Sequence, residues 1–225
     1  MFPISLGRRV RHLALAGLLL LAGWQLAGAG WIHGKALLAQ QLLGRAWLES
    51  AATGVAQKPW PWADTWPVAR LRVPGLQVEQ YVLAGTSGQA LAFGPGMHEA
   101  FAGGARNWTV LAGHRDTHFG FLGALVPGVR LSLELPDGEL RDYQVQSSRV
   151  VDSRVERLDP PPVDRPHLLL VTCYPFASVA ANGPLRFVVV ARAVYGFSKA
   201  TSASPGATHA SGSSFATRSS SSRAV

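Results

Sequence analysis

Cysteine is nearly absent from this chain of 225 residues, which has only Cys173. A single cysteine excludes an intramolecular disulfide framework and any zinc or iron–sulfur site built from several thiolates. Acidic residues are missing from both ends, since residues 1–12 and 198–225 each hold three basic residues and no Asp or Glu. Residues 66–195 hold 12 Arg against 11 Asp and Glu. This central part therefore lacks the basic excess that a nucleic-acid-binding module needs.

Polar side chains are also scarce in residues 13–32, where Gln25 is the only strongly polar one. A helix of this length measures about 30 Å, which is the thickness of the hydrocarbon core of a bilayer. Three arginines within residues 1–12 precede it, so the positive-inside rule keeps the N-terminus in the cytoplasm. We predict an uncleaved transmembrane anchor, with a signal peptide cleaved near residues 27–29 as the alternative. Both place the rest of the chain outside the cytoplasm.

Residues 33–65 are predicted to form a helical stalk and a linker rich in Pro and Trp. Apolar residues recur at helical spacing in the stalk: Leu37, Leu38, Leu42, Trp47 and Leu48. Their number favours packing of the stalk on the domain, and the prolines of residues 58–62 end the helix. At the other end, residues 196–225 are predicted to be disordered. Ten of residues 198–225 are Ser, and so few apolar groups cannot offset chain entropy.

Short apolar runs with turn signals between them replace the helical pattern from residue 66 to residue 195. Seven strands are predicted: Val68–Val73, Leu76–Val82, Trp108–Ala112, Val129–Leu135, Glu139–Val151, His167–Thr172 and Leu185–Val194. Residues 135–138 end in Asp-Gly, which is a hairpin signal, and residues 97–104 favour one short helix. This many strands in one domain argues for a β-barrel or a β-sandwich.

Cys173 and His114 both lie where a predicted strand gives way to a loop. Tyr174 and Pro175 follow the cysteine, and proline cannot continue a strand ladder. A rigid scaffold often presents reactive side chains from such loops. If the two strands are neighbours, the thiol and the imidazole form an activated nucleophile with its acid–base partner. The alternatives are an inert core cysteine and a surface histidine.

Arg186 opens the last predicted strand among Leu, Phe and Val residues. The period of two along a strand predicts that it shares a face with Val188. Its fixed set of donors could hold a carbonyl oxygen that becomes an oxyanion, and an ion pair with Asp164 is the alternative. His114 and His118 do not share a face in an irregular stretch, so their spacing does not indicate a metal site.

These residues resemble the sortase family of membrane-anchored cysteine transpeptidases. The family signature Thr-Leu-x-Thr-Cys is similar to residues 169–173, which read Leu-Leu-Val-Thr-Cys. The Ala-Gly-His context of the family histidine matches residues 112–114, and its arginine on the last strand matches Arg186. Residues 113–119 and 172–176 are most similar to the class of sortases found in Gram-negative bacteria.

The resemblance implies a closed eight-stranded β-barrel over residues 66–195. It implies that Cys173 attacks the carbonyl after Thr in a C-terminal sorting motif of Leu-Pro-x-Thr-Gly type. His114 would protonate the leaving peptide, an amine would resolve the thioester, and Arg186 would steady the oxyanion. The residues expected to contact substrate are Thr172, Leu170 and Ala112.

The resemblance also implies the partners of the protein. They are a protein substrate with a C-terminal sorting signal, an amine acceptor of unknown identity, and the inner membrane through residues 13–32. The catalytic domain would face the periplasm, and loops 151–166 and 174–184 would frame the peptide groove. No cofactor, metal or nucleic acid is expected. Two other functions stay open: a hydrolytic cysteine peptidase, and a non-catalytic envelope-anchored β-domain that binds a partner.

Overall fold

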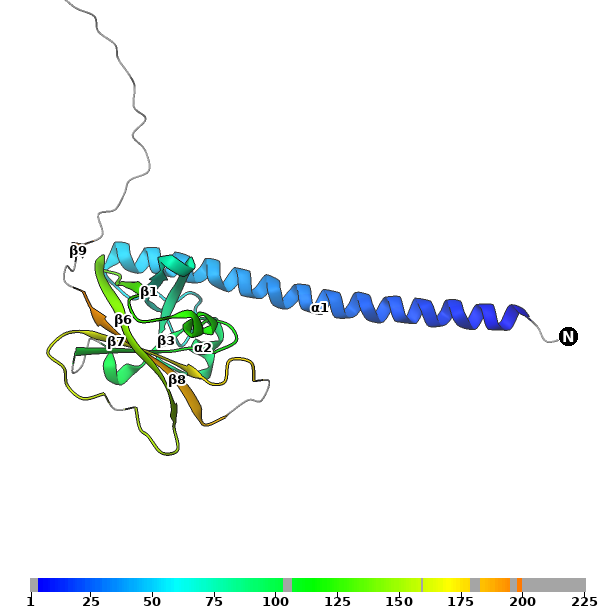
Figure 1. The fold of residues 1–225 in the computed structure, drawn as a ribbon. Coiled ribbons are helices and arrows are strands. Elements are labelled where there is room, and N and C mark those ends of the chain that lie inside the picture. Colours follow the sequence, from blue (N-terminus) through cyan, green and yellow to red (C-terminus); the bar gives the residue numbers. More distant parts are fainter. Residues whose placement is uncertain (1–3, 103–106, 159, 179–182, 195–197, 200–225) are drawn as a thin grey trace, which may run out of the picture.

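The computed structural model of the chain describes residues 4–102, 107–158, 160–178, 183–194 and 198–199. The described helices are α1 (Ile4–Thr53) and α2 (Gly88–Phe93), with 3₁₀ helices at Pro74–Leu76, Glu99–Phe101 and Gly120–Ala124. The described strands are β1 (Pro67–Val73), β2 (Val78–Ala84), β3 (Gly96–Met97), β4 (Trp108–Ala112), β5 (Arg130–Glu134), β6 (Glu139–Asp152), β7 (His167–Cys173), β8 (Leu185–Ala193) and β9 (Ser198–Lys199). α1 extends far beyond the β-domain, and only its C-terminal part lies against the strands (Figure 1).

The strands form one sheet in the order β5-β1-β2-β3-β4-β7-β8-β6-β9, and β5 also pairs with β6. This additional pairing closes β1 to β8 into a ring and confirms the predicted eight-stranded barrel. The β2–β3 and β4–β7 pairs are parallel. Because parallel neighbours end at the same edge of a sheet, β4 and β7 bring the residues that follow them to one edge of the barrel.

The seven predicted strands correspond to β1, β2 and β4 to β8, with ends that shift by at most two residues. The pattern did not predict β3, a two-residue strand that begins with glycine. A Cβ on Gly96 would collide with the carbonyl oxygen of Gly85, so only glycine allows this close backbone approach. The helix expected in residues 97–104 is the short 3₁₀ helix Glu99–Phe101, and residues 103 and 104 lie outside the described residues.

The turn between β5 and β6 is the predicted hairpin. Gly138 has a φ of 82°, a left-handed conformation that glycine adopts without steric cost. Its N–H donates to the carbonyl of Leu135 at 3.0 Å. The side chain of Asp137 accepts a hydrogen bond from the N–H of Glu139 at 2.9 Å. The Asp-Gly pair therefore sets this turn through local chemistry.

The disorder predicted for residues 196–225 is wrong at residues 198 and 199. Ser198 and Lys199 form β9 and pair with Leu140 and Glu139 of β6. The backbone of β6 offers hydrogen-bonding groups there, and they accept a strand whatever its side chains are. The rest of that prediction, residues 196–197 and 200–225, lies outside the described residues.

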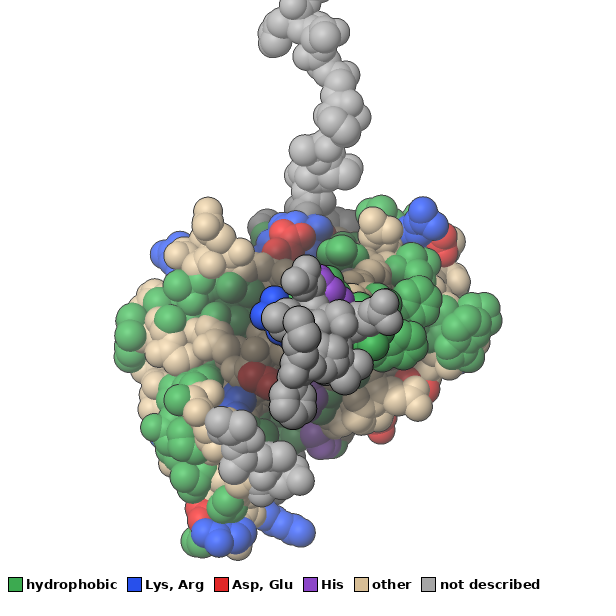
Figure 2. Space-filling view, turned by 90° about the vertical axis from the view of Figure 1, so that its right-hand side faces the viewer, with side chains coloured by type: hydrophobic (Ala, Val, Ile, Leu, Met, Phe, Trp, Pro, Cys, Tyr) green, Lys and Arg blue, Asp and Glu red, His purple; other side chains and the backbone are tan. Residues whose placement is uncertain are grey.

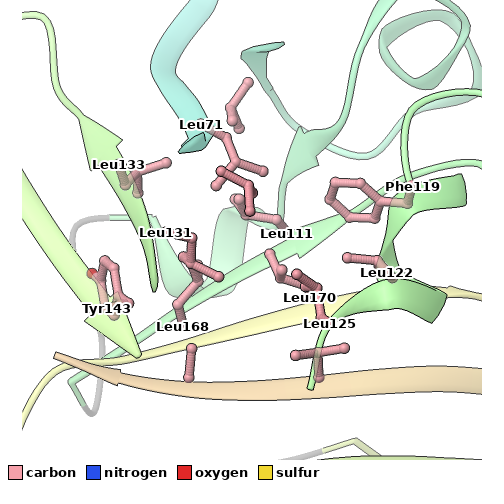
Figure 3. Close-up of a cluster of buried hydrophobic side chains, with 14 of the residues drawn as sticks. Leu71, Leu111, Phe119, Leu122, Leu125, Leu131, Leu133, Tyr143, Leu168 and Leu170 are labelled. Atoms are coloured by element: carbon pink, nitrogen blue, oxygen red, sulfur yellow. The ribbon is translucent and has the colours of Figure 1, made fainter. Parts of the chain in front are cut away.

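Apolar side chains that alternate along the strands fill the barrel interior. β1 follows this period strictly, so that Ala69, Leu71 and Val73 point inward and are fully buried. Figure 3 shows the cluster with Tyr143 at one end and Phe119 at the other. Burial raises the pKa of the Tyr143 phenol. The interior is thus a packed core, and substrate has to bind elsewhere.

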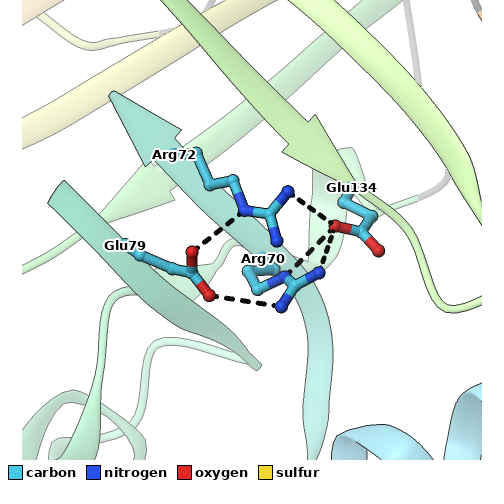
Figure 4. A network of polar contacts seen from close by, with 4 residues as sticks. All are labelled: Arg70, Arg72, Glu79 and Glu134. Atoms are coloured by element: carbon cyan, nitrogen blue, oxygen red, sulfur yellow. Dashed lines mark hydrogen bonds and ion pairs between the residues drawn. The ribbon is translucent and has the colours of Figure 1, made fainter. Parts of the chain in front are cut away.

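Charged side chains occupy the outer face of β1. Arg70 and Arg72 alternate with the inward residues and form ion pairs with Glu79 of β2 and Glu134 of β5 (Figure 4). The distance from Arg70 Nη2 to Glu134 Oε2 is 2.6 Å. Burial opposes the charge of Arg70, but the hydrogen bond to Glu134 and the nearby carboxylates raise its pKa above the usual value. The Arg70 guanidinium also lies 5.9 Å from the ring centroid of Trp47, so the network links the barrel to α1.

The last part of α1 packs on the barrel, as predicted for the stalk. One face of the helix is buried there: Ala39, Leu43, Ala46, Trp47 and Ser50. Leu37 and Leu48, which contributed to the prediction, are 68% and 66% exposed because they fall on other faces of the helix. The helix ends at Thr53 rather than near residue 57, since Gly54 adopts a left-handed φ of 70° and its N–H closes the last turn.

The predicted membrane segment, residues 13–32, lies within α1. In the part of the chain that the structure describes, no helix has both the length and the apolar character needed to cross a bilayer. The side chains of Ala29 and Ile32 in this segment lie outside the described residues.

Replacing Trp47 by Ala is expected to lower the free energy of unfolding by about 3–5 kcal/mol. The substitution removes a buried ring together with its contacts to Tyr81 and to the guanidinium of Arg70. Chemical denaturation of the full chain, followed by circular dichroism, measures the change. Leu48→Ala is the matched control, because Leu48 is exposed on the same helix and should change stability by less than about 0.5 kcal/mol. Equal losses for the two variants would contradict the packing of this face on the barrel.

Candidate active site

The register of three neighbouring strands brings the three predicted catalytic residues to one edge of the barrel. β4 and β7 are parallel, with Ala112 opposite Val171. Two residues further along, His114 follows β4 where Cys173 ends β7. β7 and β8 are antiparallel, with Cys173 directly opposite Arg186. The thiol, the imidazole and the guanidinium therefore come from adjacent chain segments at the same edge.

Cys173 and Arg186 project from the outer face of the barrel. Val171 and Val188, two positions away on the same strands, belong to a second apolar cluster outside the main core, and side chains alternate with a period of two. The N–H of Tyr174 donates to the carbonyl of Leu185 at 3.0 Å. The adjacent pair, Cys173 and Arg186, is therefore the non-hydrogen-bonded kind, in which Cβ atoms approach to about 4.5–5.5 Å. This places a positive charge beside the half-buried thiol.

A tight turn from His114 to Phe119 carries the histidine. The N–H of Phe119 donates to the carbonyl of His114 at 2.8 Å. The Phe119 ring is fully buried, and a Cβ on Gly113 would lie 2.9 Å from it, so a larger residue does not fit at Gly113. His114 itself is exposed. The core thus anchors the turn while the imidazole stays accessible to a substrate.

Thr172 faces the barrel interior rather than the thiol. Its side chain is 2% exposed, and its hydroxyl donates to the carbonyl of Gly113 at 2.7 Å. This bond joins β7 to the residue before His114. The expected substrate contact of Thr172 is therefore replaced by a structural one, because a buried hydroxyl that already donates its proton to the backbone has no proton left for a substrate.

The other two residues expected to contact substrate lie on different faces. Leu170 is fully buried in the main core and points away from the face of Cys173. Leu170 does not meet this expectation because it stands three positions before Cys173, and side chains alternate along a strand. Ala112 is half-buried opposite Val171. It shares the outer face with the thiol, and its contact with substrate stays a prediction.

Arg186 is held by the start of its own strand. Its Nη1 donates to the carbonyls of Gly183 at 2.6 Å and of Leu185 at 2.9 Å. None of the described ion pairs joins it to Asp164, which was the alternative role for this residue. Backbone carbonyls therefore fix the guanidinium without neutralising it, on the strand directly opposite Cys173.

A groove of about 250 Å³ lies on the same outer face. Its floor comes from Trp108, Leu169, Val188 and Val190. Its wall comes from residues 156–158, 160 and 161 of the loop that joins β6 to β7. The indole N–H of Trp108 donates to the carbonyl of Pro161 at 2.7 Å and holds this wall against the strands. The β6–β7 loop therefore frames a groove that begins two residues along β8 from Arg186.

Aromatic side chains border the site on the side of the β7–β8 loop. The ring of Phe187 lies 6.2 Å from that of Tyr174 and 5.2 Å from that of Phe176, measured between centroids. Arg115, next to His114, donates from Nη2 to the carbonyl of Ser178 at 2.6 Å. The described part of the loop is thus tied to the histidine turn, and residues 179–182 lie outside the described residues.

Two contacts of the histidine turn were not assigned a role from the sequence. One is the bond of Arg115 just described. The other is made by Gln80, whose Nε2 donates to the carbonyl of His118 at 2.8 Å. The sequence feature that points to Gln80 is its polar side chain between Val78 and Val82, on a strand face that is otherwise apolar.

His118 lies close enough to His114 for their charges to interact. Burial lowers the pKa of His118, and the charge of His114 lowers it further, whereas the carbonyl of Ala92 and the charge of Asp116 act in the opposite direction. The net lowering of this pKa favours the neutral form of His118. Among the residues that the structure describes, no three His, Cys, Asp or Glu side chains form a group that could hold a metal ion.

A closed β-barrel that brings a thiol, an imidazole and a guanidinium to one edge is the arrangement expected of a cysteine-dependent acyl-transfer enzyme. The sortase domain model matches residues 71–194, and the chain belongs to the sortase family of cysteine transpeptidases. A curated relative, sortase D of Bacillus subtilis, is 31% identical over 125 residues, which are 55% of this chain and 62% of that protein. The chain thus spans less than two thirds of the length of this relative.

Two solved structures share the fold. Sortase A from Corynebacterium diphtheriae is 24% identical, with a TM-score of 0.50 over 60% of this chain and 63% of that chain. Sortase C of Clostridium perfringens, solved with the C-terminal cell wall sorting motif, is 16% identical, with a TM-score of 0.50 over 72% of this chain and 90% of that chain. These relatives do not support the finer resemblance to the class from Gram-negative bacteria.

Replacing Thr172 by Val is expected to lower the free energy of unfolding by about 1–3 kcal/mol, because the buried carbonyl of Gly113 loses its donor while the volume is kept. Thr172→Ser keeps the hydroxyl and is the matched control, with a smaller loss that reflects one missing methyl group. Denaturant midpoints of the two variants and the wild type measure the effect. A loss for Val no larger than that for Ser would show that the hydroxyl does not stabilise the fold.

Proposed function

We propose that this protein cuts a C-terminal sorting motif of Leu-Pro-x-Thr-Gly type and transfers the acyl part to an amine. The convergence of Cys173, His114 and Arg186 at one edge of the barrel is the observation that carries the proposal. The sorting motif present with the Clostridium perfringens sortase C supports this kind of substrate for a related barrel. Family membership extends it to this chain.

The chemistry follows from the three side chains. The sulfur of Cys173 attacks the carbonyl carbon after Thr of the motif and forms a tetrahedral intermediate. The C–N bond then breaks, His114 gives a proton to the departing amine, and a thioester remains on Cys173. An incoming amine attacks the thioester and gives its proton to His114 as the thiolate leaves. One peptide bond replaces another, so the cycle needs no external energy source.

Arg186 has the geometry of an oxyanion partner. Two backbone carbonyls hold its Nη1, and its other guanidinium nitrogens form no hydrogen bond within the described residues. Those donors lie on the face of Cys173, where the carbonyl oxygen gains negative charge. Because the guanidinium is fixed before substrate binds, little reorganisation is needed in the transition state.

The groove suits the residues that precede the scissile bond. An extended peptide advances about 3.3 Å per residue, so two residues before the bond reach the level of Val171 and Val188. The next residues enter the groove between Trp108 and the β6–β7 loop. Its apolar floor fits the Leu and Pro of the proposed motif.

Intact mass spectrometry of the full chain in detergent tests the proposal. Incubation with a library of Leu-Pro-x-Thr-Gly peptides is expected to add the mass of the acyl fragment to the protein. Cys173 is the only cysteine, so a thioester has one possible site, and Cys173→Ala should abolish the adduct. Arg186→Lys keeps the charge but loses the planar set of donors, and it should form the adduct about 100-fold more slowly.

The fate of the adduct separates the three functions. Faster loss of the adduct with an added amine than in water, together with a new amide product, supports transpeptidation. Loss at the same rate with and without amine would show a hydrolytic peptidase instead. A folded protein that forms no adduct with any peptide would leave the binding-module alternative.

The membrane location of the protein is also proposed. The side chains that support it are apolar and exposed on α1, with exposed fractions from 57% to 78%: Leu13, Leu15, Leu18, Leu19, Leu20, Leu21, Trp24, Leu26 and Trp31. Burial of this surface in lipid would remove it from water. The domain would then stand outside the cytoplasm. If the likeness to the Gram-negative class holds, the membrane is the inner membrane and the domain faces the periplasm.

Alkaline extraction of membranes tests this location. The wild-type chain is expected to stay in the membrane pellet. A Leu18→Arg, Leu21→Arg double variant is expected to be released, because each charge near the centre of a span costs about 2.5–3.5 kcal/mol. Leu48→Arg, at an exposed position near the barrel, is the matched control and should remain in the pellet. Release of the wild type would contradict the anchor.

A further inference from the structure

Gln80 is a polar residue on the inward face of β2. It pairs with Leu71 of β1, which is fully buried in the core, and paired residues share a face of the sheet. Its neighbours on that face are Val78 and Val82, and both pack in the core cluster. An amide among such residues disfavours folding unless hydrogen bonds satisfy both of its polar atoms.

Only one end of this amide is satisfied within the described residues. Nε2 donates to the carbonyl of His118 at 2.8 Å, across 38 positions of the chain. Oε1 is buried and has no hydrogen-bond partner there. An apolar side chain of the same size would avoid the unsatisfied oxygen and would fill the core equally well. Buried polar groups without a partner are rare, and they concentrate at functional sites. The bond to His118 is therefore what explains a glutamine at this position.

The bond holds the turn that presents His114. The carbonyl of His118 and the N–H of Phe119 belong to the same peptide bond. That N–H closes the turn by donating to the carbonyl of His114 at 2.8 Å. Thr172 fixes the start of the turn through Gly113, and the Phe119 ring fixes its end in the core. Arg115 ties the turn to the carbonyl of Ser178, and Gln80 adds a constraint at His118, next to the buried ring.

We propose that Gln80 is a positioning residue, whose bond to the His118 carbonyl sets the place of the His114 imidazole relative to Cys173. The inference rests on the proposed function, since it concerns the imidazole that passes the proton to the leaving amine. Gln80 touches neither substrate nor reacting atoms and acts through the turn. A displacement of about 1 Å at a reacting group lowers rates by up to about 100-fold, so a single bond in this place has a large effect.

Gln80→Met tests the proposal in the full chain. Methionine keeps the volume and the flexibility of the side chain and removes both polar atoms. The unsatisfied oxygen disappears, but the carbonyl of His118 loses its donor, so the two effects offset and the melting temperature is expected to change little. The kcat for acyl transfer is expected to fall about tenfold or more, while KM changes by less than about twofold. Activity thus falls without a matching loss of stability, which a purely structural role would not produce.

Gln40→Met is the matched control. Gln40 also donates from Nε2 to a backbone carbonyl, that of Phe93 at 2.9 Å, but it lies on α1, and none of the described hydrogen bonds joins it to residues 114–119. The control should leave kcat and KM unchanged. Gln80→Asn retains the amide but is one methylene shorter, so it should restore part of the lost kcat only if the turn shifts to meet it.

Hydrogen exchange of the turn gives a readout that does not depend on activity. Gln80→Met is expected to speed exchange in the peptide that covers residues 114–119, and Gln40→Met is not. Faster exchange with a lower kcat supports the proposal. If Gln80→Met speeds exchange but the wild-type protein itself shows no acyl transfer, the proposed function is refuted, while the structural role of Gln80 in the turn still holds. An unchanged kcat, or a loss of kcat that only follows a loss of melting temperature, would overturn the positioning role.

Discussion

The parallel pairing of β4 with β7 is the contact on which the site depends. It joins segments almost sixty residues apart and brings their C-terminal ends to the same edge of the barrel. Two bonds continue it beyond the strands, from the Gly113 N–H to the Val171 carbonyl and from the Thr172 hydroxyl to the Gly113 carbonyl. A slip of one residue in β7 would turn Cys173 into the core and Thr172 toward substrate. The buried hydroxyl of Thr172 therefore helps to specify the register that exposes the thiol.

The site combines a fixed backbone with exposed reactive groups. Arg186 is held by two carbonyls of its own strand, and the histidine turn is held by a glycine that admits the Phe119 ring and by hydrogen bonds from Thr172 and Gln80. The hydroxyl of Thr172, the amide of Gln80 and the ring of Phe119 all lie on the inner side of the barrel wall. Substrate can thus reach the thiol and the imidazole without any of the restraints being released. Such an arrangement favours reaction because little conformational entropy is lost when the peptide binds.

Two sides of the barrel have different roles. Charged residues on the outer face of β1 and the Trp47 face of α1 join the stalk to the domain, far along the sheet from β7 and β8. On the other side, the β6–β7 loop makes a groove over the strands that carry the site. The net charge of the chain comes mostly from its ends, and basic and acidic side chains are scattered over the face shown in Figure 2. The groove itself mixes Arg149 and Arg157 with Glu156. Its apolar floor, rather than a charged surface, is what a peptide would meet.

Local patterns were enough to predict most strands and to single out Cys173, His114 and Arg186 as candidates, whereas their catalytic roles came from the resemblance to the sortase family. Apolar runs, the Asp-Gly turn and Pro175 mark where strands stop, and those stops coincide with His114 and Cys173. The role of Leu170 and Thr172 depended on the face that each residue presents, which the register with β4 and β8 decides. β3 and β9 form because distant backbones have free hydrogen-bonding groups, and the buried face of the stalk depends on the barrel beside it. Composition and spacing carry information about neighbours along the chain. Contacts between distant segments arise only when the barrel closes, because each segment then pairs with backbone hydrogen-bonding groups and apolar surfaces that belong to other segments.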